Sequence, residues 1–221
     1  MRPLHPAHIQ EVANELGIDP LYLERDWVLT EIAYRLATDA QWRDEIVLKG
    51  GQALRHVYGS ARLSKDADYV ARRRNIAFAE LCAALDIRYP KLHLPAKPVG
   101  STGQSLKVSP IEYRGPVSNG SVEIEVSVRG DLVRAPERRS YRSVFREPFE
   151  VLVMRIDEMV AEKVRALYQR GNARDLYDLW FIFGTDRGIV IAPEEVTAIL
   201  PEKFRHVSGG WQRERLFVRV E

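Results

Sequence analysis

The sequence predicts an α+β fold, in which a small mixed sheet with helices forms a first lobe and helices alone form a second. Three observations predict it. Residues 46–70 have the pattern of strand, glycine turn, short helix and second strand. Residues 121–128 alternate apolar and polar side chains, as a half-buried strand does. From residue 155 onward the apolar positions recur at helical spacing. We therefore predict two lobes, 1–150 and 151–221.

Composition sets limits on the class of protein. With 221 residues, 45% of them hydrophobic, the chain can bury a sizeable core. The net charge is only +2, so a nucleic-acid partner would have to be held by local basic patches. The single cysteine, Cys82, excludes a disulfide framework and a cysteine metal site. No stretch approaches the ~20 apolar residues that span a membrane. We expect a cytoplasmic monomer without a membrane partner.

Two helices are expected before the central segment. Residues 6–16 carry apolar side chains at helical spacing, and Gly17 follows where a helix often ends. Asp19 is a typical N-cap and Pro20 suits the first helical position. The second helix should therefore begin there and run to about Ala37.

The glycine pair in residues 46–70 is a candidate phosphate site. An apolar strand leads into Lys49, Gly50 and Gly51, and a helix follows as far as Gly59. The unpaired N–H groups at a helix start, with the positive end of its dipole behind them, suit a phosphate. The alternative is that the glycines only allow a tight turn.

The acidic pair that opens the second strand is a candidate metal site. Asp66 and Asp68 are two residues apart, so on a strand they share one face and repel each other. A cation such as Mg²⁺, which prefers carboxylate and phosphate oxygens, would relieve that repulsion. Glu125 would add a third carboxylate if its strand lies beside Asp68. The alternatives are a solvated loop pair and an ordinary surface glutamate.

The middle of the chain is predicted to hold one helix and several short strands. Asn75 is a plausible cap for a helix through Leu85, and prolines punctuate residues 89–130. Residues 105–108 form one short alternating stretch. In residues 121–128 the valine and isoleucine positions lie on one face, which should pack on helices.

The C-terminal third reads as three helices. The first begins at Arg155 and carries Lys163 in the middle of its apolar stripe. A buried ammonium needs a carboxylate or phosphate partner, unless the side chain reaches the rim. The second, after Asn172, is expected to place one apolar stripe on the core; this stripe consists of Leu176, Leu179, Trp180 and Phe183. The last helix is expected over residues 193–200.

Charged residues at the start of the second of these helices are further candidates. Asp175 and Asp178 are three residues apart and lie on one side of it. Asp175 could instead complete a capping box with Asn172. Basic residues gather in two other places, Arg72 to Arg74 and the segment 134–146, which includes Arg139. Such runs could follow an RNA backbone or form a solvated face.

Taken together, these motifs resemble the AbiEii/MenT family of nucleotidyltransferase toxins, a branch of the DNA polymerase β-like nucleotidyltransferase superfamily. The motifs occur in the family's order between residues 24 and about 183. The matching segments are Glu24-Arg25-Asp26-Trp27, Leu48 to Arg55, Leu63 to Asp68, Glu125-Val126-Ser127, Glu162 to Ala166 and Arg174 to Leu179.

The resemblance implies transfer of a nucleoside monophosphate from an NTP to an acceptor hydroxyl, with release of pyrophosphate. It implies that the catalytic residues are Asp66, Asp68, Glu125, Lys163 and Asp178, with Mg²⁺ or Mn²⁺ held by the first three. It further implies that the nucleotide is bound by Lys49, Gly50, Gly51, Gln52, Lys163, Arg174 and Asp175.

The expected partners follow from the same resemblance. They are an NTP, a tRNA whose 3′ end is the acceptor, and a cognate antitoxin, with Arg72, Arg73, Arg74 and Arg139 contacting the RNA. Modification of that end would block aminoacylation. The alternatives are nucleotidylation of a protein or the antitoxin, a catalytically idle nucleotide- or RNA-binding module, and, less favoured, a metal-dependent nuclease.

Two departures from the family pattern stand out. The family usually has Ser or Thr where this chain has Gln52, and a bulkier amide should alter the triphosphate geometry. The region after residue 183 is also short for the family. Whatever a larger C-terminal lobe contributes to acceptor binding in the family should therefore be reduced in this chain.

Overall fold

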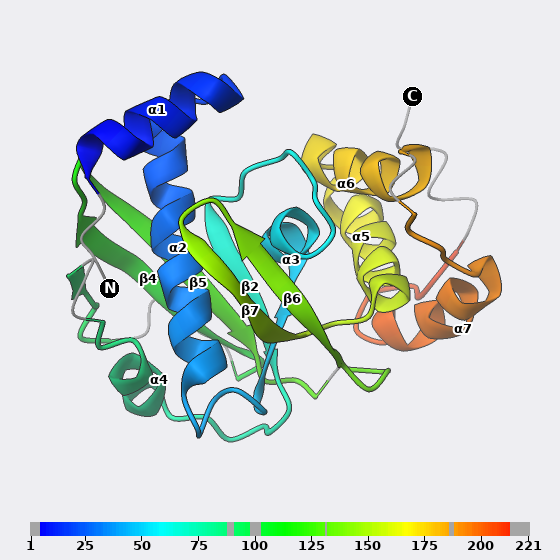
Figure 1. Cartoon of the computed structure of the whole chain (residues 1–221). Coiled ribbons are helices and arrows are strands. Elements are labelled where there is room, and N and C mark those ends of the chain that lie inside the picture. The colour runs from blue at the N-terminus through cyan, green and yellow to red at the C-terminus, as the bar shows by residue number, and fades with distance from the viewer. Residues whose placement is uncertain (1–4, 88–90, 98–102, 131, 186–187, 213–221) are drawn as a thin grey trace.

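The computed structural model describes residues 5–87, 91–97, 103–130, 132–185 and 188–212. A mixed sheet lies at the centre of the molecule, with helices packed against it and beside it (Figure 1). The helices are α1 Pro6–Leu16, α2 Pro20–Thr38, α3 Gly50–His56, α4 Phe78–Ala84, α5 Ile156–Arg170, α6 Ala173–Gly184 and α7 Pro193–Lys203. The strands are β1 Ile46–Lys49, β2 Asp66–Ala71, β3 Leu92–His93, β4 Ser105–Arg114, β5 Asn119–Ser127, β6 Glu137–Ser143 and β7 Arg146–Val153.

The sheet has seven strands in the order β3-β4-β5-β2-β1-β7-β6. Strand β2 runs antiparallel to β1 and parallel to β5, so the sheet is mixed, as predicted. It is larger than predicted, because β6 and β7 form an antiparallel pair that was not expected. The predicted division after residue 150 falls inside β7; the two-lobe division itself stays a prediction.

Helix ends follow the local signals in the sequence. The predicted helix over residues 6–16 is confirmed, and Gly17 ends it in the left-handed region at φ 63°. Asp19 caps α2 through a hydrogen bond from the backbone N–H of Leu21 to its side chain. Helix α4 differs, because it begins at Phe78 after Ala77 instead of following a cap at Asn75.

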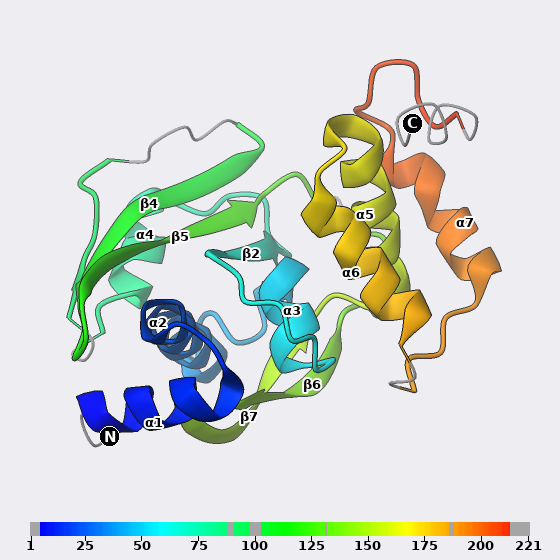
Figure 2. The ribbon, with the colours of Figure 1, turned by 90° about the horizontal axis from the view of Figure 1, so that it is seen from above.

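Helix α2 crosses one face of the sheet, as Figures 1 and 2 show. The apolar face of β5 is buried, with Ile124 and Val126 fully inaccessible, and it belongs to the same core cluster as Val28 and Ile32 of α2. The prediction that this face packs on helices is confirmed. The opposite face of β5, which carries Glu123 and Glu125, is left for polar contacts.

Helices α5, α6 and α7 gather on the side of α3 (Figures 1 and 2). They form a second buried cluster that includes Phe181, Ile199 and Phe204, and Leu54 of α3 joins it. The end of the β1–α3 unit therefore lies between the sheet and these helices. Among the described residues, none of the helices is both long and apolar enough to cross a membrane.

Of the apolar stripe predicted for α6, Leu179 is partly buried against the core and the other three members are exposed. Leu176, Trp180 and Phe183 are 51%, 57% and 61% exposed. The buried face instead carries Phe181 and Ile182, together with Asp175 and Asp178. The two aspartates are turned inward because cations on neighbouring elements bind them, so electrostatic pairing prevails over the apolar pattern of the helix.

Candidate active site

The turn from β1 into α3 can be built only with glycine at its first position. Gly50 has φ +68°, which L side chains rarely adopt, and a Cβ atom there would lie 2.6 Å from Oδ2 of Asp68. The glycine thus allows the backbone to pass directly beside this carboxylate. Helix α3 begins at that contact.

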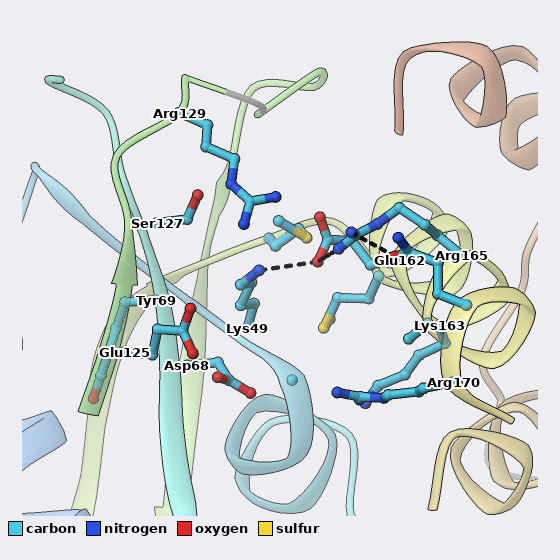
Figure 3. Close-up of a pocket in the computed structure, with 15 residues that line it drawn as sticks. Lys49, Asp68, Tyr69, Glu125, Ser127, Arg129, Glu162, Lys163, Arg165 and Arg170 are labelled. Carbon is cyan, nitrogen blue, oxygen red and sulfur yellow. Dashed lines mark hydrogen bonds and ion pairs between the residues drawn. The ribbon is translucent and has the colours of Figure 1, made fainter. Parts of the chain in front are cut away.

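Strand register brings the acidic side chains together. Lys49 is paired with Asp68 across β1 and β2, and Asp68 is paired with Glu125 across β2 and β5. Side chains of paired residues in adjacent strands lie on the same face of a sheet. The condition set by the sequence, that the strand of Glu125 lies beside Asp68, is therefore met. Figure 3 shows both carboxylates facing the space in front of the sheet.

Asp68 is an uncompensated carboxylate. Burial, together with the neighbouring charges of Asp66 and Glu125, raises its pKa to about 6, against the opposing effect of Lys49 and Lys163. Within the described part of the chain its carboxylate has no hydrogen bond or ion pair. Such a group favours binding of a cation.

The other strand carboxylates lie differently. Asp66 accepts a 2.8 Å hydrogen bond from Ser64 and lines an adjacent open cavity with Glu123, its register partner. No three His, Cys, Asp or Glu side chains of the described residues converge closely enough to hold a metal ion by themselves. The three-carboxylate metal site stays a prediction. The orphaned Asp68 carboxylate, with Glu125 beside it, nevertheless fits a hard divalent cation, which also takes ligands from substrate phosphates.

A cavity of about 200 Å³ separates the sheet from α5. Lys49, Gly50, Asp68 and Glu125 line it from the sheet side, and Figure 3 shows Lys163, Arg165 and Arg170 facing it from α5. Nζ of Lys49 lies 2.9 Å from Oε2 of Glu162. The sheet wall thus carries the carboxylates of Asp68 and Glu125, and the opposite wall carries the cations Lys163, Arg165 and Arg170.

Lys163, which the sequence places in an apolar stripe, is paired with carboxylates, as a buried ammonium requires. Its Nζ lies 2.8 Å from Oδ2 of Asp178 and 3.2 Å from Oδ1 of Asp175, and both aspartates are fully buried. Arg170 binds Asp175 with two further hydrogen bonds of 2.8 and 3.0 Å. Burial acts to raise the pKa of Asp175, but Arg170 and Lys163 hold it below its usual range. Asn172 caps the helix through the backbone N–H of Arg174.

Arg62, which no sequence pattern indicated, joins this cluster to the sheet side. Its guanidinium donates two hydrogen bonds to Asp178, of 2.8 and 2.9 Å. A Cβ atom on Gly51 would lie 2.7 Å from Nη2 of the same arginine. The second glycine therefore leaves room for a contact that joins the loop before β2 to α6.

Three of the predicted nucleotide-binding side chains lie outside the cavity lining, those of Gln52, Arg174 and Asp175. Gln52 is 1% exposed, and its Oε1 accepts a 2.9 Å hydrogen bond from the hydroxyl of Tyr141. Arg174 is exposed at the start of α6. Arg170, one turn earlier at the end of α5, lines the cavity instead.

The predicted RNA-binding arginines have separate surroundings. Arg72 donates to the backbone carbonyl of Asp44, Arg73 contacts Glu80, and Arg139 on the edge strand β6 lies 3.2 Å from Glu137. Arg74 is the member of this set that lies near the cavity. The lining residues that were not predicted as site residues include Ser127, Arg129, Glu162, Arg165 and Arg170. These residues could have been found from the sequence, because Ser127 and Arg129 closely follow Glu125, and the other three lie near Lys163 on α5.

Comparison with known proteins identifies the family. Residues 32–215 match the family model described as nucleotidyl transferase AbiEii toxin of type IV toxin–antitoxin systems. The chain belongs to the AbiEii family of nucleotidyltransferase toxins. The resemblance seen in the sequence motifs is thereby confirmed. Among curated proteins, none is significantly similar to this AbiEii chain in sequence.

Solved structures share the fold of this AbiEii toxin. The nucleotidyltransferase toxin MenT4 from Mycobacterium tuberculosis H37Rv superposes with a TM-score of 0.72 at 21% identity, over 95% of this chain and 74% of the other. JHP933 from Helicobacter pylori gives a TM-score of 0.58 at 20% identity, over 86% of this chain and 75% of the other. At these identities the likeness concerns the fold.

Proposed function

We propose that this toxin transfers a nucleoside monophosphate from an NTP to the 3′ end of a tRNA and so blocks aminoacylation. The observation that carries the proposal is the arrangement of charge around the cavity. Asp68 and Glu125, which make no ion pair with the described residues, face Lys163 and Arg170 across it. Nucleotidyl transfer needs both a metal site and cations for the phosphates.

The proposed roles follow from these positions. Asp68 and Glu125, with Asp66 beside them, would hold Mg²⁺ or Mn²⁺, which supplies charge neutralisation for the phosphates. Lys49 and Lys163 would contact phosphate oxygens, with Asp175 and Asp178 holding Lys163 in place. The backbone at Gly50 lies beside the metal-binding carboxylates and so would position the triphosphate close to them.

The proposed reaction is a single in-line displacement at the α-phosphorus of the NTP. The oxygen of the RNA 3′ hydroxyl bonds to the α-phosphorus, and the bond between that phosphorus and the α–β bridging oxygen breaks. Pyrophosphate leaves with that oxygen, and the hydroxyl proton passes to Glu125 or to solvent. Cations at both the attacking and the leaving side favour this step.

The buried position of Gln52 bears on the idle-module alternative. That alternative drew support from a bulky amide beside the triphosphate, but the side chain packs in the core against Tyr141. The amide therefore does not obstruct the cavity. The geometry favours an active enzyme over a passive binding module.

The test is to incubate the protein with each α-³²P-labelled NTP, Mg²⁺ and total tRNA, and to separate RNA from protein. We expect label on the RNA, removed by digestion of the 3′-terminal nucleotide, and mass spectrometry of the tRNA 3′ ends identifies the added nucleotide. Label on the protein or on a co-purified antitoxin, with none on RNA, would contradict the tRNA acceptor. Shortened RNA without label would indicate a nuclease.

A further inference from the structure

A second cavity of about 140 Å³ adjoins the first one and shares Arg129, Arg165 and Gln169 with it. We call it the basic annex, defined by its basic lining residues Arg74, Arg129, Arg165, Lys203, Arg205 and His206. Among the described residues that line it, Glu202 is the single acidic side chain, and it is bound by Arg205. The annex therefore carries an excess of positive charge.

The partners of these cations show where that excess lies. Lys203 is neutralised, because its Nζ lies 2.6 Å from Glu158 and 3.2 Å from Glu162. Arg165 lies 3.6 Å from Glu162. Arg74 and Arg129, in contrast, make no ion pair or hydrogen bond within the described ranges. The uncompensated charge of the annex is concentrated on these two residues.

A glycine lets the side chain of Arg74 pass directly beside the backbone that follows Arg129. Gly130 directly follows Arg129 and has φ +70°, and a Cβ atom there would lie 2.7 Å from Nε of Arg74. The Nε groups of Arg129 and Arg165 are buried and have no hydrogen-bond partner. Like charges held together with unsatisfied buried donors are unfavourable unless an anion joins them. The annex thus has the chemistry of an anion site.

The anion is not the reacting triphosphate. Arg129 follows Glu125 by four residues along the β5 strand and its extension, which corresponds to about 13 Å. Figure 3 shows Arg129 well apart from Asp68 and reaching toward the cavity from the end of β5. A metal-bound triphosphate would lie at Asp68, whereas the base and ribose of the same NTP carry no charge. A second phosphate-bearing molecule fits the annex better.

We propose that the basic annex binds the phosphate backbone of the RNA acceptor upstream of its reacting 3′ end. This inference rests on the proposed function, since it requires RNA as the acceptor. Arg74 and Arg129 contact phosphate oxygens, and the continuous cavity lets the terminal nucleotide reach Asp68. The site selects an RNA end by charge rather than by base sequence.

The test measures RNA binding without NTP, by fluorescence anisotropy of 5′-labelled tRNA with the full chain. We expect Arg74→Ala to weaken binding about tenfold and to lower the slope of log Kd against log salt by about 0.7. Arg74→Glu is expected to weaken binding further. The KM for NTP, measured by pyrophosphate release at saturating tRNA, is expected to change less than about twofold.

Arg35→Ala is the control, because Arg35 is a partly exposed arginine outside the annex whose partner, Asp39, lies one helical turn away. It is expected to leave tRNA binding unchanged. The annex is refuted if Arg74→Ala binds tRNA normally, if only the KM for NTP rises, or if Arg72→Ala has the same effect as Arg74→Ala. Failure of the wild-type protein to label tRNA would refute the proposed function instead, since the binding measurement contains no NTP.

Discussion

Two pairs of aspartates, one on β2 and one on α6, lie near the cavity, and they differ in how their charge is compensated. Asp175 and Asp178 on α6 are fully buried, and Lys163, Arg170 and Arg62 bind them. Asp66 and Asp68 on β2 are partly exposed and bind no protein cation within the described residues.

This difference distinguishes carboxylates that stabilise the fold from carboxylates that are open to bind a ligand. A buried carboxylate with two cationic partners is already satisfied and has little to offer a ligand. A carboxylate whose pKa is raised to about 6, as at Asp68, is stabilised by any cation that binds it. The β2 pair is therefore the better candidate for metal binding, and the α6 pair holds Lys163 in position.

The largest effect is expected for Asp68→Asn, which keeps the shape of the side chain and removes its charge. Nucleotidyl transfer should fall about 10²–10³-fold, since charge stabilisation at the metal site is lost. Because burial and like charges oppose ionisation of Asp68, the same variant should raise Tm at pH 7.5 by about 2–6 °C. Label transfer and thermal melting of the metal-free protein measure both. A fall in Tm would contradict the uncompensated state of Asp68.

Asp178→Asn should act on stability in the opposite direction. Lys163 and Arg62 would be left partly buried with incomplete compensation, at a cost of about 3–5 kcal/mol, or about 6–20 °C in Tm. The control is Asp44→Asn, whose 51%-exposed side chain pairs with Arg138 on the surface and should change stability by about 0.5 kcal/mol or less. Urea denaturation of the three proteins measures this. Equal stability of Asp178→Asn and wild type would contradict the structural role.

A matched pair of glutamates on β5 tests which carboxylates act with Asp68. Glu125→Gln removes the carboxylate paired with Asp68 in the cavity and should lower the transfer rate about 10²-fold. Glu123→Gln alters a residue on the same face that binds Lys107 at 2.6 Å and Ser109 at 2.8 Å instead. It should keep most of the activity. Similar losses of activity in the two variants would show that the pairing of Glu125 with Asp68 across the strands does not determine its role in the transfer.

The smallest effect expected is a pH dependence of metal affinity. With a folded-state pKa of about 6, Asp68 becomes protonated as the pH falls below 6, and Mn²⁺ affinity should then weaken about tenfold per pH unit. The stability of the metal-free protein should change in the opposite direction. Because the pKa of Asp68 is raised in the folded state, its contribution to stability is fully present below the unfolded-state pKa and is lost as the pH rises through 6. Calorimetric titration at pH 5 to 8 measures the affinity. An Asp68→Asn protein should lack this dependence, and a flat wild-type profile would contradict it.

Local signals in the sequence predicted many helix and strand positions. The helix before Gly17, the start of α2 at Pro20 and the alternation along β5 depend on residues next to one another in the chain. The strands β6 and β7 were missed because their exposed polar residues hide the alternation; four of the seven residues of β6 are Arg or Glu. The α6 stripe was predicted to be buried because helical periodicity shows which side chains share a face but does not show which face has a partner.

The candidate site shows the same division between local and long-range information. The local patterns were enough to predict the glycine turn, the carboxylate pair, the cation in the apolar stripe of α5 and, through the order of the motifs, the family. The tertiary structure was needed to show that Glu125 lies beside Asp68, that Lys163 binds Asp175 and Asp178, and that Arg74 and Arg129 line the same annex. These contacts join segments far apart in the chain, and strand register and helix packing, which no local pattern encodes, bring them together.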